Sequence, residues 1–234
     1  MGRTDPRAGE KHVIGLARAV VYRFLARCLS YPDMELTGLF TGDSLAEILG
    51  SLSVLGLDAS AEMKEITAWL ESAGPEASLG KLEVEYTRLF VNAYPRIPAP
   101  PYSSVYLDKD RQVWGPSTAQ AGRFYEEAGL SPSEDFADIP DHISAELEFI
   151  SYLILEQQKL RPEGTAAGQD TVEIEGRFLA NHFLKWVAQF LNQVVKSTEN
   201  TFYGAIAHLA LRFVELETIR INSSRTAETG HQSA

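Results

Sequence analysis

Position 142 and its neighbours hold the residue types best suited to chemistry. His142 and Glu146 stand four residues apart on a predicted helix, so an imidazole and a carboxylate share one helix face. Such a pair can supply two metal ligands, but a catalytic metal needs a third. The other histidines show no ligand-like spacing: His12, His182, His208 and His231. A metal-dependent hydrolase using His142 and Glu146 is therefore the alternative function. We favour a His and a Glu at the edge of a groove, bonded to each other or to an incoming chain.

Asp141, Ser103 and Ser104 are the other candidates for chemistry. Asp141 lies in the first turn of the same predicted helix, where the helix dipole and free backbone N–H groups stabilise a carboxylate. Its helical angle directs it away from His142 and Glu146. Either serine would be a nucleophile only beside a base, which the sequence does not reveal. The motifs GxSxG, Walker A, GxGxxG, HExxH and CxxC are absent. The sequence therefore does not support an enzyme.

The two serines follow a segment rich in proline, YPRIPAPPYSSVY at residues 94–106. Its prolines forbid a helix and favour an extended, polyproline-like loop. Aromatic residues gather around this loop: Tyr94, Tyr102, Tyr106 and Trp114. We expect these rings to pack the loop onto the helices. The alternative is an aromatic-lined groove that binds an apolar peptide.

Helical elements must position these residues. Apolar residues recur at helical spacing almost throughout and period-2 alternation is lacking, so an all-α fold is predicted. We expect a single helical domain at residues 10–220, a flexible N-terminus at 1–9, a hinge near 129–139 and a disordered tail at 221–234. About nine helices are predicted: 9–30, 33–40, 43–55, 59–73, 78–92, 116–129, 140–161, 172–196 and 199–220.

Cys28 is the only cysteine among the 234 residues. It lies on the apolar stripe of the first predicted helix, so we expect it in the core. A single cysteine excludes an internal disulfide framework, a thiolate zinc cage and an iron–sulfur cluster held by this chain alone. This usage, with the lack of a signal peptide or an uninterrupted apolar span, predicts a cytoplasmic protein.

The net charge of −11 is concentrated in the middle of the chain. Residues 126–175 hold thirteen acidic side chains against Lys159 and Arg161. No basic run interleaves with aromatic residues, so a nucleic-acid partner is not expected. Two interpretations of the acidic segment stay open, a solvated face that keeps the protein soluble and a landing site for a basic peptide.

Three stretches in this order resemble the TorD/DmsD/NarJ family of redox-enzyme maturation chaperones: EVEYTRLFVN (83–92), PAPPYSSVYLDKDRQVWG (98–115) and IPDHISAELEFISYL (139–153). The strongest element is Pro140, Asp141 and His142 opening a helix, with Glu146 four residues after the histidine. The closing segments FLANHFLKWVAQF and TFYGAIAHLALRF look like the family's last helices. The resemblance spans residues 10–220 and implies an all-helical chaperone.

The resemblance implies binding of the twin-arginine signal peptide and the apo catalytic subunit of an exported molybdoenzyme, until the molybdenum cofactor is inserted. Some relatives bind guanine nucleotide or the molybdopterin cofactor, but no phosphate-cradling loop is visible, so we expect no cofactor or only weak binding. The chain is expected to be a monomer, or a homodimer that swaps halves at the hinge. The predicted peptide-binding residues are Tyr86, Leu89, Phe90, Pro101, Tyr102, Ser104, Trp114, Gly115, Asp141, His142 and Glu146. Leu89 and Phe90 are either core or groove residues.

Overall fold

The structure is a computed structural model that describes residues 6–130, 139–160 and 166–231. Within those ranges the chain is helical and forms no strand, which confirms the all-α prediction. The helices are α1 (Pro6–Cys28), α2 (Met34–Gly38), α3 (Gly42–Val54), α4 (Ser60–Ala73), α5 (Pro75–Tyr86), α6 (Ser103–Leu107), α7 (Pro116–Glu127), α8 (Ile143–Leu160), α9 (Ala166–Asn181), α10 (Val187–Ser197) and α11 (Thr201–His231). The π-helical turn η1 (Thr87–Val91) continues α5, and the 3₁₀-helical turn η3 (Phe183–Lys185) lies between α9 and α10.

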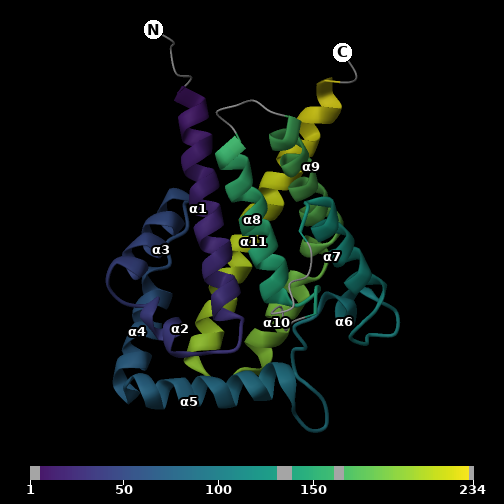
Figure 1. Cartoon of the computed structure of the whole chain (residues 1–234). Helices are drawn as coiled ribbons and strands as arrows, with labels where there is room; N and C mark the ends of the chain where they lie inside the picture. The colour runs from purple at the N-terminus through teal and green to yellow at the C-terminus, as the bar shows by residue number, and fades with distance from the viewer. Residues whose placement is uncertain (1–5, 131–138, 161–165, 232–234) are drawn as a thin grey trace.

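The long helices α1, α8 and α11 form the centre of the molecule (Figure 1). The α1–α8 contact is the most extensive, and α3 and α4 pack on one side while α9 and α10 pack on the other. Helix α5 crosses beneath the bundle, and α6 and α7 lie on the side away from α3 (Figure 1). In the core, Val21 and Leu25 of α1 and Ile150 of α8 are fully buried. Cys28 is buried too, as predicted, and its burial raises the pKa of the thiol.

The predicted helix 172–196 is wrong, because the chain breaks between α9 and α10. His182 and Trp186 leave the helical region, with φ/ψ of −132°/−76° and −126°/−32°. Both side chains point into the interior and hydrogen-bond to Glu146 of α8. Regular backbone hydrogen bonds are lost at this break, where the two side chains bind Glu146 instead. The spacing of apolar residues in the sequence does not encode these side-chain contacts.

Other element boundaries also differ from the predictions. The helix expected at 78–92 ends in the π-helical turn η1, and the short helix α6 forms where an extended loop was expected. Helix α1 begins at Pro6, inside the segment expected to be flexible, and α11 continues to His231 through the segment expected to be disordered. Most of the predicted hinge, residues 131–138, lies outside the described residues.

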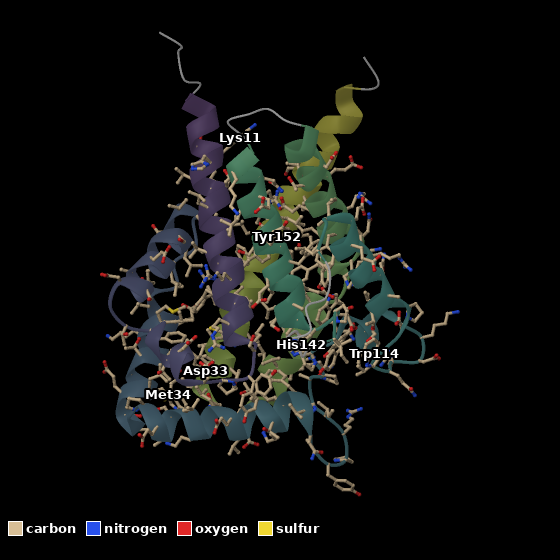
Figure 2. The ribbon with its side chains drawn as sticks, viewed as in Figure 1. Lys11, Asp33, Met34, Trp114, His142 and Tyr152 are labelled. Atoms are coloured by element: carbon tan, nitrogen blue, oxygen red, sulfur yellow. The ribbon has the colours of Figure 1, made fainter. Side chains whose placement is uncertain are left out.

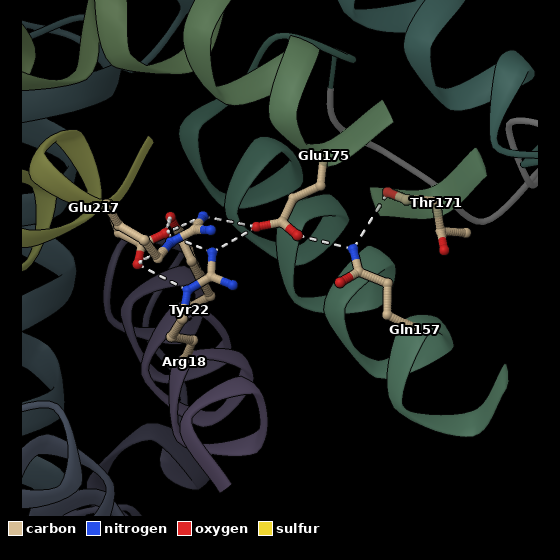
Figure 3. A network of polar contacts seen from close by, with 7 residues as sticks. Arg18, Tyr22, Gln157, Thr171, Glu175 and Glu217 are labelled. Carbon is tan, nitrogen blue, oxygen red and sulfur yellow. Dashed lines mark hydrogen bonds and ion pairs between the residues drawn. The ribbon is translucent and has the colours of Figure 1, made fainter. Parts of the chain in front are cut away.

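Arg18 of α1 is the centre of a buried charge network that joins α1 to α9 and α11 (Figure 3). Its guanidinium donates to Glu217 at 2.8 Å from Nε, and from Nη2 to Glu175 and Glu217 at 2.5 Å each. Arg220 binds the same two carboxylates at 2.9 and 3.1 Å, and the Tyr22 hydroxyl donates to Glu217. Two positive and two negative charges thus neutralise each other, as buried charges must.

The network shifts the acidity of Glu217 strongly. Burial by itself would raise the pKa of Glu217, but the charges and hydrogen bonds of Arg18 and Arg220 outweigh it and lower the pKa to about 2. Gln157 of α8 extends the network by donating to Glu175 at 2.8 Å and to the Thr171 carbonyl at 3.2 Å (Figure 3). Four helices are therefore joined at one polar centre.

Candidate functional site

The three segments that carry the family resemblance are linked in succession to the start of α8. The Ala99 N–H donates to the Leu89 carbonyl at 3.0 Å, which fastens the proline-rich loop to η1. The Ser103 N–H donates to the Asp141 carbonyl at 3.0 Å, and the Ile143 N–H donates to the Pro101 carbonyl at 2.8 Å. These bonds place Tyr102 opposite His142 in an isolated antiparallel bridge. The backbone itself therefore holds the three segments together.

Asp141 is fully buried and caps a helix other than its own. Its Oδ2 accepts a 2.9 Å hydrogen bond from the Ser104 N–H and a 3.4 Å contact from the Ser103 hydroxyl, both at the start of α6. The expectation that Asp141 serves the first turn of its own helix is therefore wrong, because α8 begins two residues later at Ile143. Asp141 Oδ1 and Ser104 Oγ are buried and have no hydrogen-bond partner among the described residues.

Glu146 is the centre of a second buried polar cluster. Its Oε1 lies 2.8 Å from His182 Nε2, and its Oε2 accepts from the Trp186 indole N–H at 2.9 Å. The two ring nitrogens of His182 also contact Ser103 Oγ and Gln120 Oε1, each at 3.2 Å. Burial raises the pKa of Glu146, against the opposing effect of His182. Glu146 and Asp141 thus share one network through Ser103 and His182, although their helical angles differ.

His142 has a different environment from Glu146, although the two share a helical face by sequence. Its Nδ1 lies 2.7 Å from Ser144 Oγ and accepts from the Ser144 N–H at 3.2 Å, while the Tyr102 ring packs edge-on at 5.2 Å. Both carboxylate oxygens of Glu146 are directed to residues of the α9–α10 break instead. Across the residues that the structure describes, no three His, Cys, Asp or Glu side chains gather in a way that could hold a metal ion.

The predicted apolar contacts at the end of α5 and on η1 are core residues. Tyr86, Leu89 and Phe90 are all buried, and Phe90 packs against the rings of Tyr86 at 4.9 Å and Tyr203 at 5.6 Å. Their position beneath the surface favours the core interpretation over the groove. Contact of these three residues with a peptide stays a prediction.

The aromatic residues near the proline-rich loop do not form one groove. Tyr106 stacks on Trp186 at 5.5 Å, and Tyr102 is half-buried against His142. Tyr94 and Trp114 instead project into solvent, with 99 % and 71 % of their surfaces exposed. Figure 2 shows Trp114 on the loop beside α6, to the side of His142 at the lower end of α8. Tyr102 and Tyr106 therefore pack against the fold, whereas Tyr94 and Trp114 are accessible to a partner.

The loop that carries Trp114 is closed by Asp108. Asp108 accepts from the Ser117 hydroxyl at 2.6 Å and from the Ser117 N–H at 3.2 Å, so the two ends of the loop are held together. Trp114 has a φ of 70°, unusual for a bulky residue, and a Cβ at Gly115 would lie 2.0 Å from the Asp108 carboxylate. A side chain at position 115 would therefore displace the Asp108 carboxylate from its hydrogen bonds to Ser117. The loop holds an exposed tryptophan in a fixed, strained conformation.

The acidic segment is not one continuous charged face. Asp141, Glu146 and Glu175 are buried, and Arg177 pairs with Glu127 on the surface. Exposed acids include Glu126, Glu148, Asp170 and Glu173. The acids at 134, 135, 138 and 163 lie outside the described residues. Part of the charge counted in the sequence therefore stabilises the interior.

The polar partners of Glu146 at the α9–α10 break were not predicted from the sequence. His182 shows no ligand-like spacing in the sequence, and Trp186 lies in the closing segment FLANHFLKWVAQF without a predicted polar partner. The two residues are four positions apart, so a continuous helix would place them on one face. This spacing is the only feature of the sequence that indicates a shared partner. The actual backbone is broken there, and Glu146 is the common partner of both.

The family model described as nitrate reductase delta subunit matches residues 55–192, which include all three resembling segments. This chain belongs to that family. The resemblance to the TorD/DmsD/NarJ maturation proteins is thereby confirmed.

Individual relatives agree with the family match. The probable Tat proofreading chaperone DmsD of Haemophilus influenzae is 26 % identical over 152 residues, which cover 65 % of this chain and 66 % of that protein. The chaperone protein TorD of Shewanella loihica is 26 % identical over 210 residues, covering 86 % of this chain and 91 % of that protein. TorD of Aliivibrio salmonicida is 29 % identical over 120 residues, or 50 % and 54 % of the two chains.

A solved structure supports the fold at the same level of identity. A protein of Archaeoglobus fulgidus assigned to redox enzyme maturation superposes with a TM-score of 0.54 at 25 % identity, covering 84 % of this chain and 93 % of that one. In the described part of the chain, every helix is too short or too polar to cross a membrane.

Proposed function

We propose that this protein is a cytoplasmic chaperone for an exported molybdoenzyme. It binds the twin-arginine signal peptide and the apo form of the catalytic subunit, and holds them until the molybdenum cofactor is inserted. Membership of the family and the names of its relatives support the chaperone role. The observation that carries the proposal is that backbone hydrogen bonds link the three resembling segments in succession to the start of α8.

This junction offers binding without bond chemistry. A signal peptide combines arginines with an apolar segment. The junction combines the Asp141 carboxylate, whose buried Oδ1 has no partner among the described residues, with the half-buried Tyr102 and, on the neighbouring loop, the exposed Trp114. Burial of the apolar segment supplies affinity at about 25 cal/mol per Å². The acidic side chains contribute mainly to association rate and register.

Calorimetry with synthetic signal peptides tests this proposal. The peptides come from the exported molybdoenzymes encoded in the same genome, and each is paired with a control whose two arginines are changed to glutamine. We expect at least one native peptide to bind with a negative heat-capacity change, because apolar area is buried. Its glutamine control should bind more weakly. Failure of every native peptide to bind would refute the signal-peptide role.

A further inference from the structure

The proline-rich loop carries an exposed surface that the signal-peptide role does not use. The loop follows η1 and projects below α5, away from the helical bundle (Figure 1). Between the loop and α10 lies a hollow of about 490 Å³, lined by Arg88, Asn92, Tyr94, Arg96, Gln193 and Ser197 together with Ala93, Pro95 and Pro98. This volume is in the range of ligand or side-chain pockets. We call these lining residues the loop hollow.

The stretch of loop that lines the hollow is anchored to η1 by two backbone hydrogen bonds. The Asn92 N–H donates to the Thr87 carbonyl at 2.8 Å, and the Ala99 N–H donates to the Leu89 carbonyl at 3.0 Å. Arg88 forms one wall by donating to both oxygens of Glu85, at 2.7 and 2.8 Å, and to the Ser197 carbonyl at 2.7 Å. Prolines between the two anchors stiffen the loop. A partner would thus meet a surface that is already ordered.

The charge of the loop hollow is opposite to that of the whole protein. Its lining includes two arginines and no acidic residue, whereas the chain carries a net charge of −11. The charge of Arg88 is neutralised by Glu85. Arg96 is exposed and forms no ion pair with any described residue, and Lys196 lies beside the lining residue Ser197 on α10. An uncompensated positive charge therefore stands at the hollow.

Tyr94 adds an apolar anchor to this charge. Its side chain is 99 % exposed beside Arg96, and nothing in the described fold covers it. Tyrosine and arginine are, with tryptophan, enriched at the energetically important positions of protein interfaces. A rigid loop that presents both beside a hollow fits a protein segment with a carboxylate next to an apolar side chain.

We infer that the loop hollow binds an acidic segment of the catalytic subunit outside its signal peptide. This inference rests on the proposed function. The arginines of the signal peptide would be repelled by Arg96, whereas a carboxylate would be attracted to it. The protein then holds its client at two surfaces of opposite charge, one near the start of α8 and one at the loop hollow.

Arg96→Glu and Tyr94→Ala test the inference in the full-length protein. The probe is the purified apo catalytic subunit of an exported molybdoenzyme from the same genome, with its signal peptide removed. Arg23→Glu is the matched control. Arg23 is exposed on α1 and is not a lining residue of the loop hollow, and its substitution changes the charge by the same amount. We expect the first two variants to bind the probe at least about fivefold more weakly than the wild type, and Arg23→Glu to bind within about twofold.

The isolated signal peptide separates this inference from the proposed function. It should bind Tyr94→Ala like the wild type and should bind Arg96→Glu equally well or more tightly. If the wild type binds the signal peptide but not the shortened subunit, the loop hollow inference is overturned while the proposed function stands. Equal losses in Arg96→Glu and Arg23→Glu, or no loss in either, would also overturn it. If neither peptide nor subunit binds the wild type, both proposals fail.

Discussion

Asp141 is a buried carboxylate with one oxygen committed to the fold and one without a described partner. Asp141→Asn keeps an oxygen that can accept from the Ser104 N–H, so we expect the free energy of unfolding to change by at most about 1 kcal/mol. If the charge attracts the signal-peptide arginines, the same variant should bind the peptide about tenfold more weakly, equivalent to ~1.4 kcal/mol. Denaturant titration and calorimetry measure the two effects. An unfolded variant, or unchanged peptide affinity, would contradict a binding role.

Glu217 gives the stability of the protein a defined pH dependence. Its pKa is about 2 in the fold, below the ordinary value of 4.5, so the unfolded chain takes up its proton at higher pH. The stabilising contribution is therefore complete above about pH 4.5 and is lost as the pH falls toward 2. Thermal unfolding of the wild type and Glu217→Gln should show a gap at pH 7 that narrows below pH 4.5. A gap that is constant over this range would show that the charge of Glu217 does not matter.

Among the elements, the π-helical turn η1 carries both buried and exposed apolar side chains. Leu89 and Phe90 are buried, whereas the next residue, Val91, is 54 % exposed. We expect Leu89→Ala and Phe90→Ala each to cost roughly 2–5 kcal/mol of folding stability. Val91→Ala is the matched control and should cost less than about 0.5 kcal/mol. Urea unfolding measures all three, and full stability of the first two variants would restore the groove interpretation.

For the molecule as a whole, the net charge of −11 predicts salt-dependent capture of a basic peptide. Raising NaCl from about 50 to about 500 mM should slow association with the signal peptide several-fold while dissociation changes little, because screening shortens the range of attraction. Stopped-flow fluorescence measures both rates. The peptide with glutamine in place of its two arginines should show a shallower salt dependence. Equal slopes for the two peptides would rule out electrostatic steering by these arginines.

The amino-acid sequence by itself determined the fold class and the family. Helical periodicity is a local property, so it identified the buried stripe of α1, including Cys28, without knowledge of any partner. The order of three short motifs was likewise sufficient to predict the family, which the match over residues 55–192 confirms. Periodicity reports which face of a helix is buried, but it cannot report what covers that face.

Only the tertiary structure decided the partners of the buried polar residues. Arg18 and Glu217 are 199 residues apart in the chain, and Glu146 meets His182 over 36 residues. Helix packing brings such pairs together, and the distances between packed helices cannot be inferred from a local sequence pattern. The predicted helix is likewise interrupted at His182, where the imidazole and the Trp186 indole bind the Glu146 carboxylate. A buried carboxylate needs hydrogen-bond donors, and in this chain the bundle supplies them from distant segments.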